Sequence, residues 1–154
     1  MTSIAHVGMS VPDLDRAVAW YGDVLGLDPL VPAARVDLDG GHAGTVAADV
    51  LGGDIGSFRQ AHLTSANGVA LELFEFERPH ARWRGLFHVC FVPERLDRTA
   101  ARIAATGGRR SSRVWRLFPD GPYRMCYCED PFGTTIELYS HSHERTYSNR
   151  NGAG

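Results

Sequence analysis

Two histidines and two glutamates occupy equivalent places in a chain that repeats part of its own sequence. His6 opens the stretch HVGMSVPDLDR and His88 opens HVCFVPERLDR, and both stretches share His-Val, Val-Pro and Leu-Asp-Arg. Glu72 lies in VALELFEF and Glu137 in TTIELYSH, which share a core of Leu or Ile, Glu, Leu and an aromatic residue. Imidazole nitrogens and carboxylate oxygens are ligands that Zn, Ni, Fe, Mn and Co accept. The four residues therefore predict a site for one divalent metal ion.

The apolar surroundings of the two acids support the same prediction. Side chains alternate between the faces of a strand, so Glu72 shares a face with Phe74, while Glu137 lies between two aliphatic residues. A carboxylate on so apolar a strand is costly to bury unless it is paired or bound to a cation. The repeat supplies a partner for each acid, because His6 begins the unit that Glu72 ends and His88 begins the unit that Glu137 ends. Two coordination positions would stay open for substrate or water.

Each repeat predicts the order β-α-β-β-β, starting with the strand that carries the histidine. Helices are predicted over residues 14–25, between Asp13 and Gly26, and from Leu96 to Ala104, ended by a pair of glycines. The later strands are expected at residues 46–50, 58–63 and 69–76 in the first repeat and at 112–118, 124–128 and 135–140 in the second. Turns are predicted at residues 67–68 and 130–133, and most of residues 31–56 is expected to be a long loop.

These elements predict an α+β fold in a single domain. Residues 1–143 would form this domain, with module one at residues 1–78 and module two at residues 85–143. Residues 144–154 have no periodicity and are expected to be a disordered tail. A chain of 154 residues is long enough to bury the core of one such unit.

The composition excludes several classes of function. The formal net charge is −2, and the sequence has no block of basic residues, so we expect no nucleic-acid partner. Apolar runs are far shorter than the roughly 20 residues that span a bilayer, and the N-terminus does not resemble a secretory signal. We therefore predict a cytoplasmic protein without a membrane partner. An odd number of cysteines, three, makes a disulfide framework unlikely.

Other side chains compete with the four predicted ligands. His141 and His143 form a rival pair, since His141 lies on the same strand face as Glu137, but the first repeat has no counterpart of this pair. Cys90 follows His88 by two residues and is expected to be a small core residue rather than a ligand or nucleophile. The remaining histidines, which are expected to face solvent, are His42, His62 and His80.

The repeated stretches resemble the vicinal oxygen chelate superfamily over about residues 4–141. HVGMSVPDLDRAVAWYGDVLGL is similar to the opening pattern of that superfamily and DPFGTTIELY to its closing pattern. Glyoxalase I, methylmalonyl-CoA epimerase, extradiol dioxygenases, fosfomycin-inactivating enzymes and bleomycin-binding proteins are members. The resemblance implies a glyoxalase-like fold, in which paired βαβββ modules form a half-open mixed β-barrel around a divalent metal. It also implies a homodimer and places the metal ligands at His6, Glu72, His88 and Glu137.

Within this superfamily, the sequence favours a lyase or isomerase of the glyoxalase or epimerase type. The substrate would be a small oxo- or hydroxy-acid derivative whose enediolate the metal stabilises, with Glu137 or Glu72 as the base. Residues 115–125 contain no histidine, which argues against the ring-cleaving dioxygenases that carry one there. Two alternatives stay open: an Fe(II)-dependent dioxygenase-like enzyme acting on a phenolic or polyketide-like metabolite, and a resistance protein that sequesters a small molecule. Use of glutathione or another thiol is also open.

Positive charge gathers in the second module and has two interpretations. Its arginines, with Trp115 and Tyr123, form either a contact surface for an anionic or aromatic substrate or a solvated strand edge. These arginines are Arg110, Arg113, Arg116 and Arg124.

Overall fold

The computed structural model describes residues 1–66, 68–78, 81–129 and 133–148. Its strands are β1 (Ser3–Ser10), β2 (Asp28–Val36), β3 (Phe58–Thr64), β4 (Ala70–Phe76), β5 (Leu86–Val92), β6 (Arg109–Arg110), β7 (Trp115–Arg116), β8 (Arg124–Glu129) and β9 (Thr135–Tyr139). Its α-helices are α1 (Leu14–Leu25), α2 (Gly41–Leu51), α3 (Leu96–Ala105) and α4 (His143–Tyr147), with single 3₁₀ turns at Gly53–Ile55 and Ala81–Trp83.

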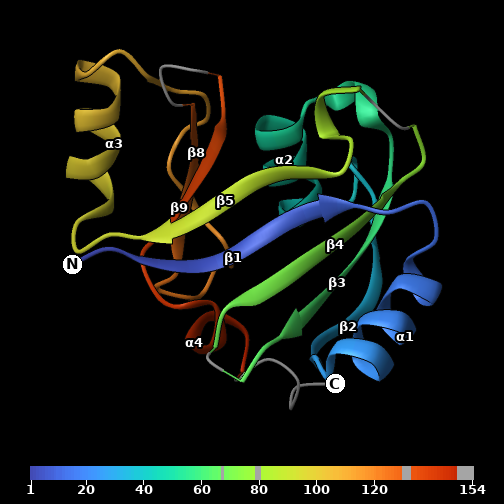
Figure 1. The fold of residues 1–154 in the computed structure, drawn as a ribbon. Coiled ribbons are helices and arrows are strands. Elements are labelled where there is room, and N and C mark those ends of the chain that lie inside the picture. The colour runs from blue at the N-terminus through green and yellow to red at the C-terminus, as the bar shows by residue number, and fades with distance from the viewer. Residues whose placement is uncertain (67, 79–80, 130–132, 149–154) are drawn as a thin grey trace.

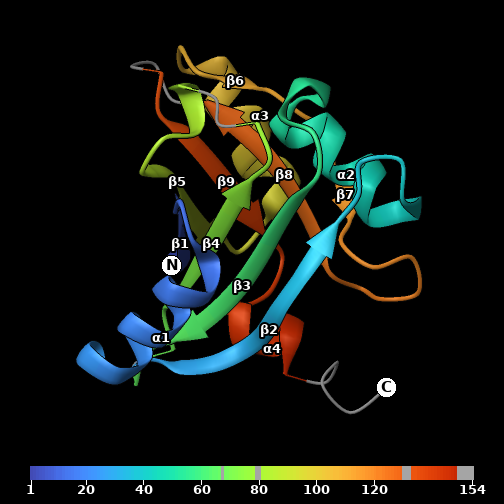
Figure 2. The same ribbon diagram turned by 90° about the vertical axis from the view of Figure 1, so that its right-hand side faces the viewer.

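The described strands form one mixed sheet that curls without closing. The strand order is β2-β3-β4-β1-β5-β9-β8-β6, and β7 pairs with β8 outside this path. Figures 1 and 2 show how the sheet curls, with β1 and β5 side by side at its centre. This arrangement confirms the predicted α+β, half-open glyoxalase-like fold, while the module boundaries at residues 78 and 85 stay a prediction.

The two halves of the sheet pair their strands in the same way. β1 pairs with β4 and β5 pairs with β9, both in parallel, while β1 and β5 pair antiparallel. Glu72 lies opposite Gly8, two residues after His6, and Glu137 lies opposite Cys90, two residues after His88. The register therefore places both acids at equivalent distances along their strands from the histidines.

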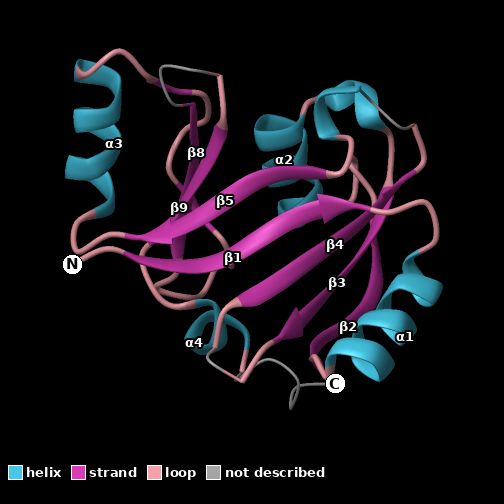
Figure 3. Ribbon diagram, viewed as in Figure 1, coloured by secondary structure: helices cyan, strands magenta, loops and turns pink. Residues whose placement is uncertain are grey.

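Two helices cover the outer surface of the sheet, as predicted, and Figure 3 shows them at opposite ends of it. α1 begins after Asp13, whose side chain accepts a hydrogen bond from the Arg16 N–H at 3.0 Å, and ends at Gly26 in the left-handed conformation, with φ of 68°. Leu14 of α1 is fully buried against β3 and β4. α3 packs against β8 and β9 through Leu96 and its neighbours.

The prediction for residues 31–56 was wrong in two respects. Residues expected to form a loop belong to β2, whose two prolines are tolerated because β2 is an edge strand that pairs only with β3. Residues 46–50, expected to form a strand, lie in the helix α2. Val46, Ala47 and Leu51 are buried on one side of that helix, at a spacing that fits a helical turn.

Two other predictions need correction. The strand expected at residues 112–118 is much shorter in the structure. It is β7, which covers Trp115–Arg116 and pairs with β8. The tail expected to be disordered is helical where it begins, because α4 covers residues 143–147 and buries Thr146. Residues 130–132 of the predicted turn and residues 149–154 of the tail lie outside the described residues. In the described part of the chain, no helix combines the length and apolarity needed to cross a membrane.

Candidate metal centre

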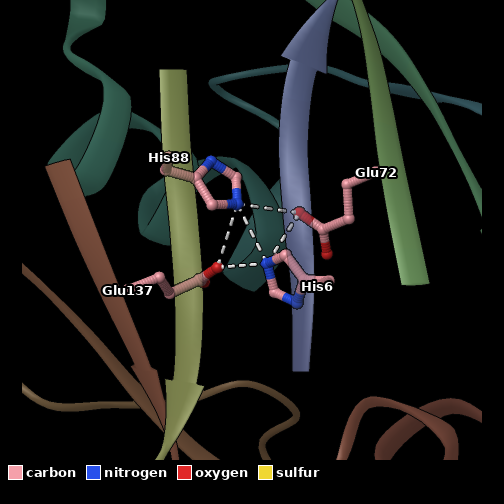
Figure 4. Close-up of side chains that lie close together, drawn as sticks. All are labelled: His6, Glu72, His88 and Glu137. Carbon is pink, nitrogen blue, oxygen red and sulfur yellow. Dashed lines mark hydrogen bonds and ion pairs between the residues drawn. The ribbon is translucent and has the colours of Figure 1, made fainter. Parts of the chain in front are cut away.

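Four neighbouring strands bring the predicted ligands together inside the curled sheet. His6 comes from β1, Glu72 from β4, His88 from β5 and Glu137 from β9, and Figure 4 shows their polar ends pointing toward one another. All four side chains are buried, with exposed fractions of 0–5%. One nitrogen or oxygen of each lies within 4.8 Å of those of the others, which makes the cluster a group that could hold a metal ion.

The distances between these donor atoms suit a single small cation. His6 Nε2 lies 2.6 Å from Glu137 Oε2, 2.9 Å from His88 Nε2 and 3.3 Å from Glu72 Oε2. His88 Nε2 lies 3.3 Å from Glu137 Oε2 and 3.5 Å from Glu72 Oε2. Ligand atoms about 2.1 Å from an ion at the centre of a tetrahedron are roughly 3.4 Å apart. Three of these distances, 3.3–3.5 Å, match that spacing, and the two shorter ones are hydrogen-bond lengths. The nitrogen and oxygen donors therefore fit a divalent metal.

The charges in the cluster also favour a cation. Burial would raise the pKa of Glu72 and Glu137, but the neighbouring histidines, His6 foremost, outweigh burial and lower the pKa of both carboxyls. Burial would lower the pKa of His88, but hydrogen bonds to Glu137 and Glu72 raise it to about 9. Two carboxylates thus share a site shielded from water, where positive charge is needed to balance them.

A pocket of about 140 Å³ lies beside the cluster. Glu72 and Glu137 contribute to its wall, and most of the remaining wall is apolar or aromatic. The helix α2 supplies one side through Ala47 and its neighbours, so the segment mispredicted from sequence lines the pocket. Two tryptophans hold α2 in place, because Trp115 Nε1 donates to Asp49 Oδ2 at 2.6 Å and Trp83 Nε1 donates to the Leu51 carbonyl at 3.1 Å.

The prediction that His62 faces solvent was wrong. His62 is 1% exposed and lies opposite Glu72 in the antiparallel pair of β3 and β4. Its Nε2 is 3.5 Å from Glu72 Oε1. The sequence did not indicate this contact, because the turn predicted at residues 67–68 would place Leu63 opposite Glu72, and the observed pairing of Thr64 with Ala70 shifts the register by one residue.

His143 is the second histidine whose place the sequence did not indicate. It is fully buried behind the cluster, where its Nδ1 lies 2.8 Å from His6 Nδ1 and its Nε2 lies 3.1 Å from His62 Nδ1. Burial lowers the pKa of His143 to about 2. His141, its predicted partner, lies apart and is half-buried, with its Nδ1 2.8 Å from Ser140 Oγ. The rival pair is therefore split between two environments.

Among the described residues, the other sequence candidates do not belong to the donor cluster. His42 is half-buried rather than solvent-facing, with Nε2 2.6 Å from the Arg116 carbonyl, and His80 lies outside the described residues. Cys90 is fully buried in the core, as predicted. Among the described residues, the four arginines of the second module do not line the pocket. Arg124 pairs with Asp97 at the surface, which supports the interpretation as a solvated edge.

Comparisons with known proteins identify the family. A family model described as the Glyoxalase/Bleomycin resistance protein/Dioxygenase superfamily matches residues 3–138. The chain belongs to this superfamily. Members of the superfamily use a divalent metal, and the buried cluster is a group that could bind one. A comparison with curated proteins found no match.

Several solved structures share the fold of this superfamily member. Methylmalonyl-CoA epimerase from Mycobacterium tuberculosis has a TM-score of 0.62 at 23% identity, covering 93% of this chain and 90% of that one. Its Streptomyces coelicolor counterpart in complex with 2-nitronate-propionyl-CoA has a TM-score of 0.59 at 24% identity, with coverages of 88% and 94%. A mutant of 4-hydroxymandelate synthase from Streptomyces coelicolor has a TM-score of 0.65 at 16% identity, covering 89% of this chain and 38% of that one.

Proposed function

We propose that the protein is a divalent-metal-dependent isomerase or lyase of the glyoxalase or epimerase type. The observation that carries this proposal is the convergence of two imidazoles and two carboxylates beside an apolar pocket. His6, Glu72, His88 and Glu137 would hold the ion, and their nitrogen and oxygen donors suit Zn, Ni, Fe, Mn or Co. A bound divalent ion supplies Lewis-acid stabilisation of negative charge on two neighbouring substrate oxygens.

Glu137 is the base that we propose for proton removal from the substrate. Both glutamates reach the pocket, but Glu72 faces His62 on its second oxygen, which ties it to the protein more firmly. Among the described residues, the histidines that pair with Glu137 are His6 and His88, the proposed ligands themselves. Glu137 would take the proton as it loosens from the centre, and Glu72 is the alternative base.

The lining of the pocket supports an apolar substrate body with two adjacent oxygens directed at the cluster. Phe58, Phe74 and Met125 form part of the wall, and Gln60 and three tyrosines add neutral polar groups. No lysine or arginine contributes to the lining within the described residues. A small oxo- or hydroxy-acid derivative would therefore place its oxygens at the metal and its carbon chain against the aromatic wall.

Metal uptake and proton exchange test the proposal together. Purified protein is stripped with chelator and reloaded separately with Zn²⁺, Ni²⁺, Co²⁺, Mn²⁺ or Fe²⁺, and the bound metal is measured by elemental analysis. Oxo- and hydroxy-acid derivatives, including CoA thioesters, are then incubated in D₂O. We expect one ion per chain and metal-dependent loss of a substrate C–H signal in NMR spectra. Protein that takes up none of these ions would contradict the proposal.

The aromatic wall of the pocket also supports a second candidate function, oxidation of a phenolic or polyketide-like metabolite. Oxygen consumption by the Fe²⁺-loaded protein with phenolic substrates, without C–H exchange, would favour it over the isomerase or lyase. Tight ligand binding by metal-free protein, without turnover, would instead indicate a sequestering resistance protein. The homodimer and the cytoplasmic location stay predictions.

A further inference from the structure

A chain of three histidines runs behind the proposed metal centre and joins two of its ligands. His6 Nδ1 lies 2.8 Å from His143 Nδ1, and His143 Nε2 lies 3.1 Å from His62 Nδ1. The chain ends at Glu72, where His62 Nε2 is 3.5 Å from Oε1. Residues from β1, α4, β3 and β4 thus connect one proposed ligand, His6, with another, Glu72.

This chain has a direction, because a neutral imidazole has one N–H donor and one acceptor nitrogen. If His6 presents a bare Nε2 to a metal, its Nδ1–H must donate to His143 Nδ1. The Nε2–H of His143 then donates to His62 Nδ1, which leaves the Nε2–H of His62 facing the carboxylate of Glu72. The opposite direction would place the lone pair of His62 Nε2 against that carboxylate, where two acceptors repel.

An unpartnered atom supports the same direction. His62 Nε2 is the single buried side-chain nitrogen or oxygen without a hydrogen-bond partner in the described part of the chain. A buried polar atom of this kind is costly unless something faces it. The carboxylate of Glu72 is the nearest charged group, so an N–H on His62 Nε2 is directed at a negative charge.

We propose that His143 and His62 are positioning residues that fix the tautomer of His6 and hold Glu72. This inference rests on the proposed metal centre and assigns a role to α4, which carries His143 into the core. In this relay of His6, His143 and His62, the two histidines behind the centre hold the lone pair of His6 Nε2 toward a bound divalent ion. Outer partners of metal-binding histidines have this effect in general, and their loss typically weakens metal binding by about 10- to 100-fold.

The relay also predicts how many ions bind. His62, Glu72 and His143 form a second group whose donor atoms lie within 4.8 Å of one another. In the relay, both nitrogens of His143 are occupied and His62 Nε2 carries a proton, so this group has too few free donors for a metal. We therefore expect one ion per chain rather than two.

Nuclear magnetic resonance of ¹⁵N-histidine-labelled protein tests the relay without any activity measurement. In the Zn²⁺-loaded protein, we expect rings protonated at Nε2 for both His62 and His143. A ring protonated at Nδ1 at either position, or two zinc ions per chain, would overturn the relay. A wild type that binds no zinc would overturn the proposed function and the relay with it, whereas zinc binding with a ring protonated at Nδ1 would overturn the relay alone.

Three variants separate positioning from simple packing. His143→Phe fills the space but has no acceptor, whereas His143→Asn keeps an acceptor near Nδ1 and leaves space unfilled. We expect zinc affinity, measured by chelator competition, to fall about 10- to 100-fold in His143→Phe and to recover partly in His143→Asn. His141→Phe is the matched control and should bind zinc as the wild type does. Equal affinity of His143→Phe and the wild type, or a better affinity of His143→Phe than of His143→Asn, contradicts the relay.

Circular dichroism shows which variants fold. If His143→Phe is unfolded, His62→Phe and His62→Gln take its place, because Gln retains an N–H that can reach toward Glu72. The relay then requires tighter zinc binding by His62→Gln than by His62→Phe, and the reverse order overturns it.

Discussion

Gly8 lies directly opposite His88 across the antiparallel pair of β1 and β5, and the imidazole occupies the space where a side chain at Gly8 would be. A Cβ atom added to Gly8 would lie 1.9 Å from His88 Cε1 and 2.6 Å from its Nε2. The absence of a side chain at Gly8 therefore allows His88 to reach the cluster. On the other side of the same ladder, Cys90 lies opposite His6, so each histidine faces a small residue.

Gly8→Ala should displace His88 and disable the metal centre. Because the added methyl group overlaps the ring, either His88 leaves the cluster or the strands shift, at a cost of about 1–3 kcal/mol in unfolding free energy. We expect zinc affinity, measured by chelator competition, to fall at least 100-fold. Gly53→Ala is the control, since nothing lies within 4 Å of a Cβ at that position. Wild-type zinc affinity in Gly8→Ala would show that His88 is not a ligand.

Glu137→Gln should separate proton transfer from metal binding. An amide cannot act as the base, so we expect C–H exchange in D₂O to fall by about 10²- to 10⁴-fold while the variant still takes up metal. Glu72→Gln should mainly weaken metal affinity, because Glu72 is proposed as the ligand held by His62. If Glu72→Gln loses exchange at full metal occupancy and Glu137→Gln does not, the roles of the two acids are reversed.

Ala47→Phe should narrow the substrate pocket without affecting the metal. Ala47 lines the pocket from α2, on the wall that faces the substrate. We expect KM to rise at least tenfold for the substrate found in the exchange screen, with unchanged metal content. Ala48→Phe is the neighbouring control, because Ala48 does not line the pocket. Equal KM values for the two variants would argue that the substrate binds elsewhere.

Trp115→Phe should loosen α2. The variant removes the hydrogen bond from Trp115 Nε1 to the exposed Asp49, which is worth about 1 kcal/mol in unfolding free energy. Denaturant unfolding measures this loss. Combining Trp115→Phe with Asp49→Ala should add little further loss, because one change removes the donor and the other removes the acceptor of the same hydrogen bond. Additive losses would mean that the two residues stabilise the fold independently.

Much of the fold and four of the site residues could be predicted from the sequence because their signals are local or duplicated. Asp13 and Gly26 mark the ends of α1 within a few residues of the helix itself. The repeat places His6 and His88 in equivalent strands, and the acids follow from the apolar strands around them. These patterns depend on neighbours in the chain and on a comparison of its two halves.

Only the tertiary structure decided the placement of α2, His62 and His143. α2 is short and interrupted by glycine, and its buried face exists because the curled sheet provides a hollow for it. The hydrogen bond between His6 and His143 spans 137 positions in the sequence, and the contact between His143 and His62 spans 81. Contacts between residues so far apart in the sequence leave no local sequence pattern. They become favourable only when the folded strands exclude water and bring the rings together.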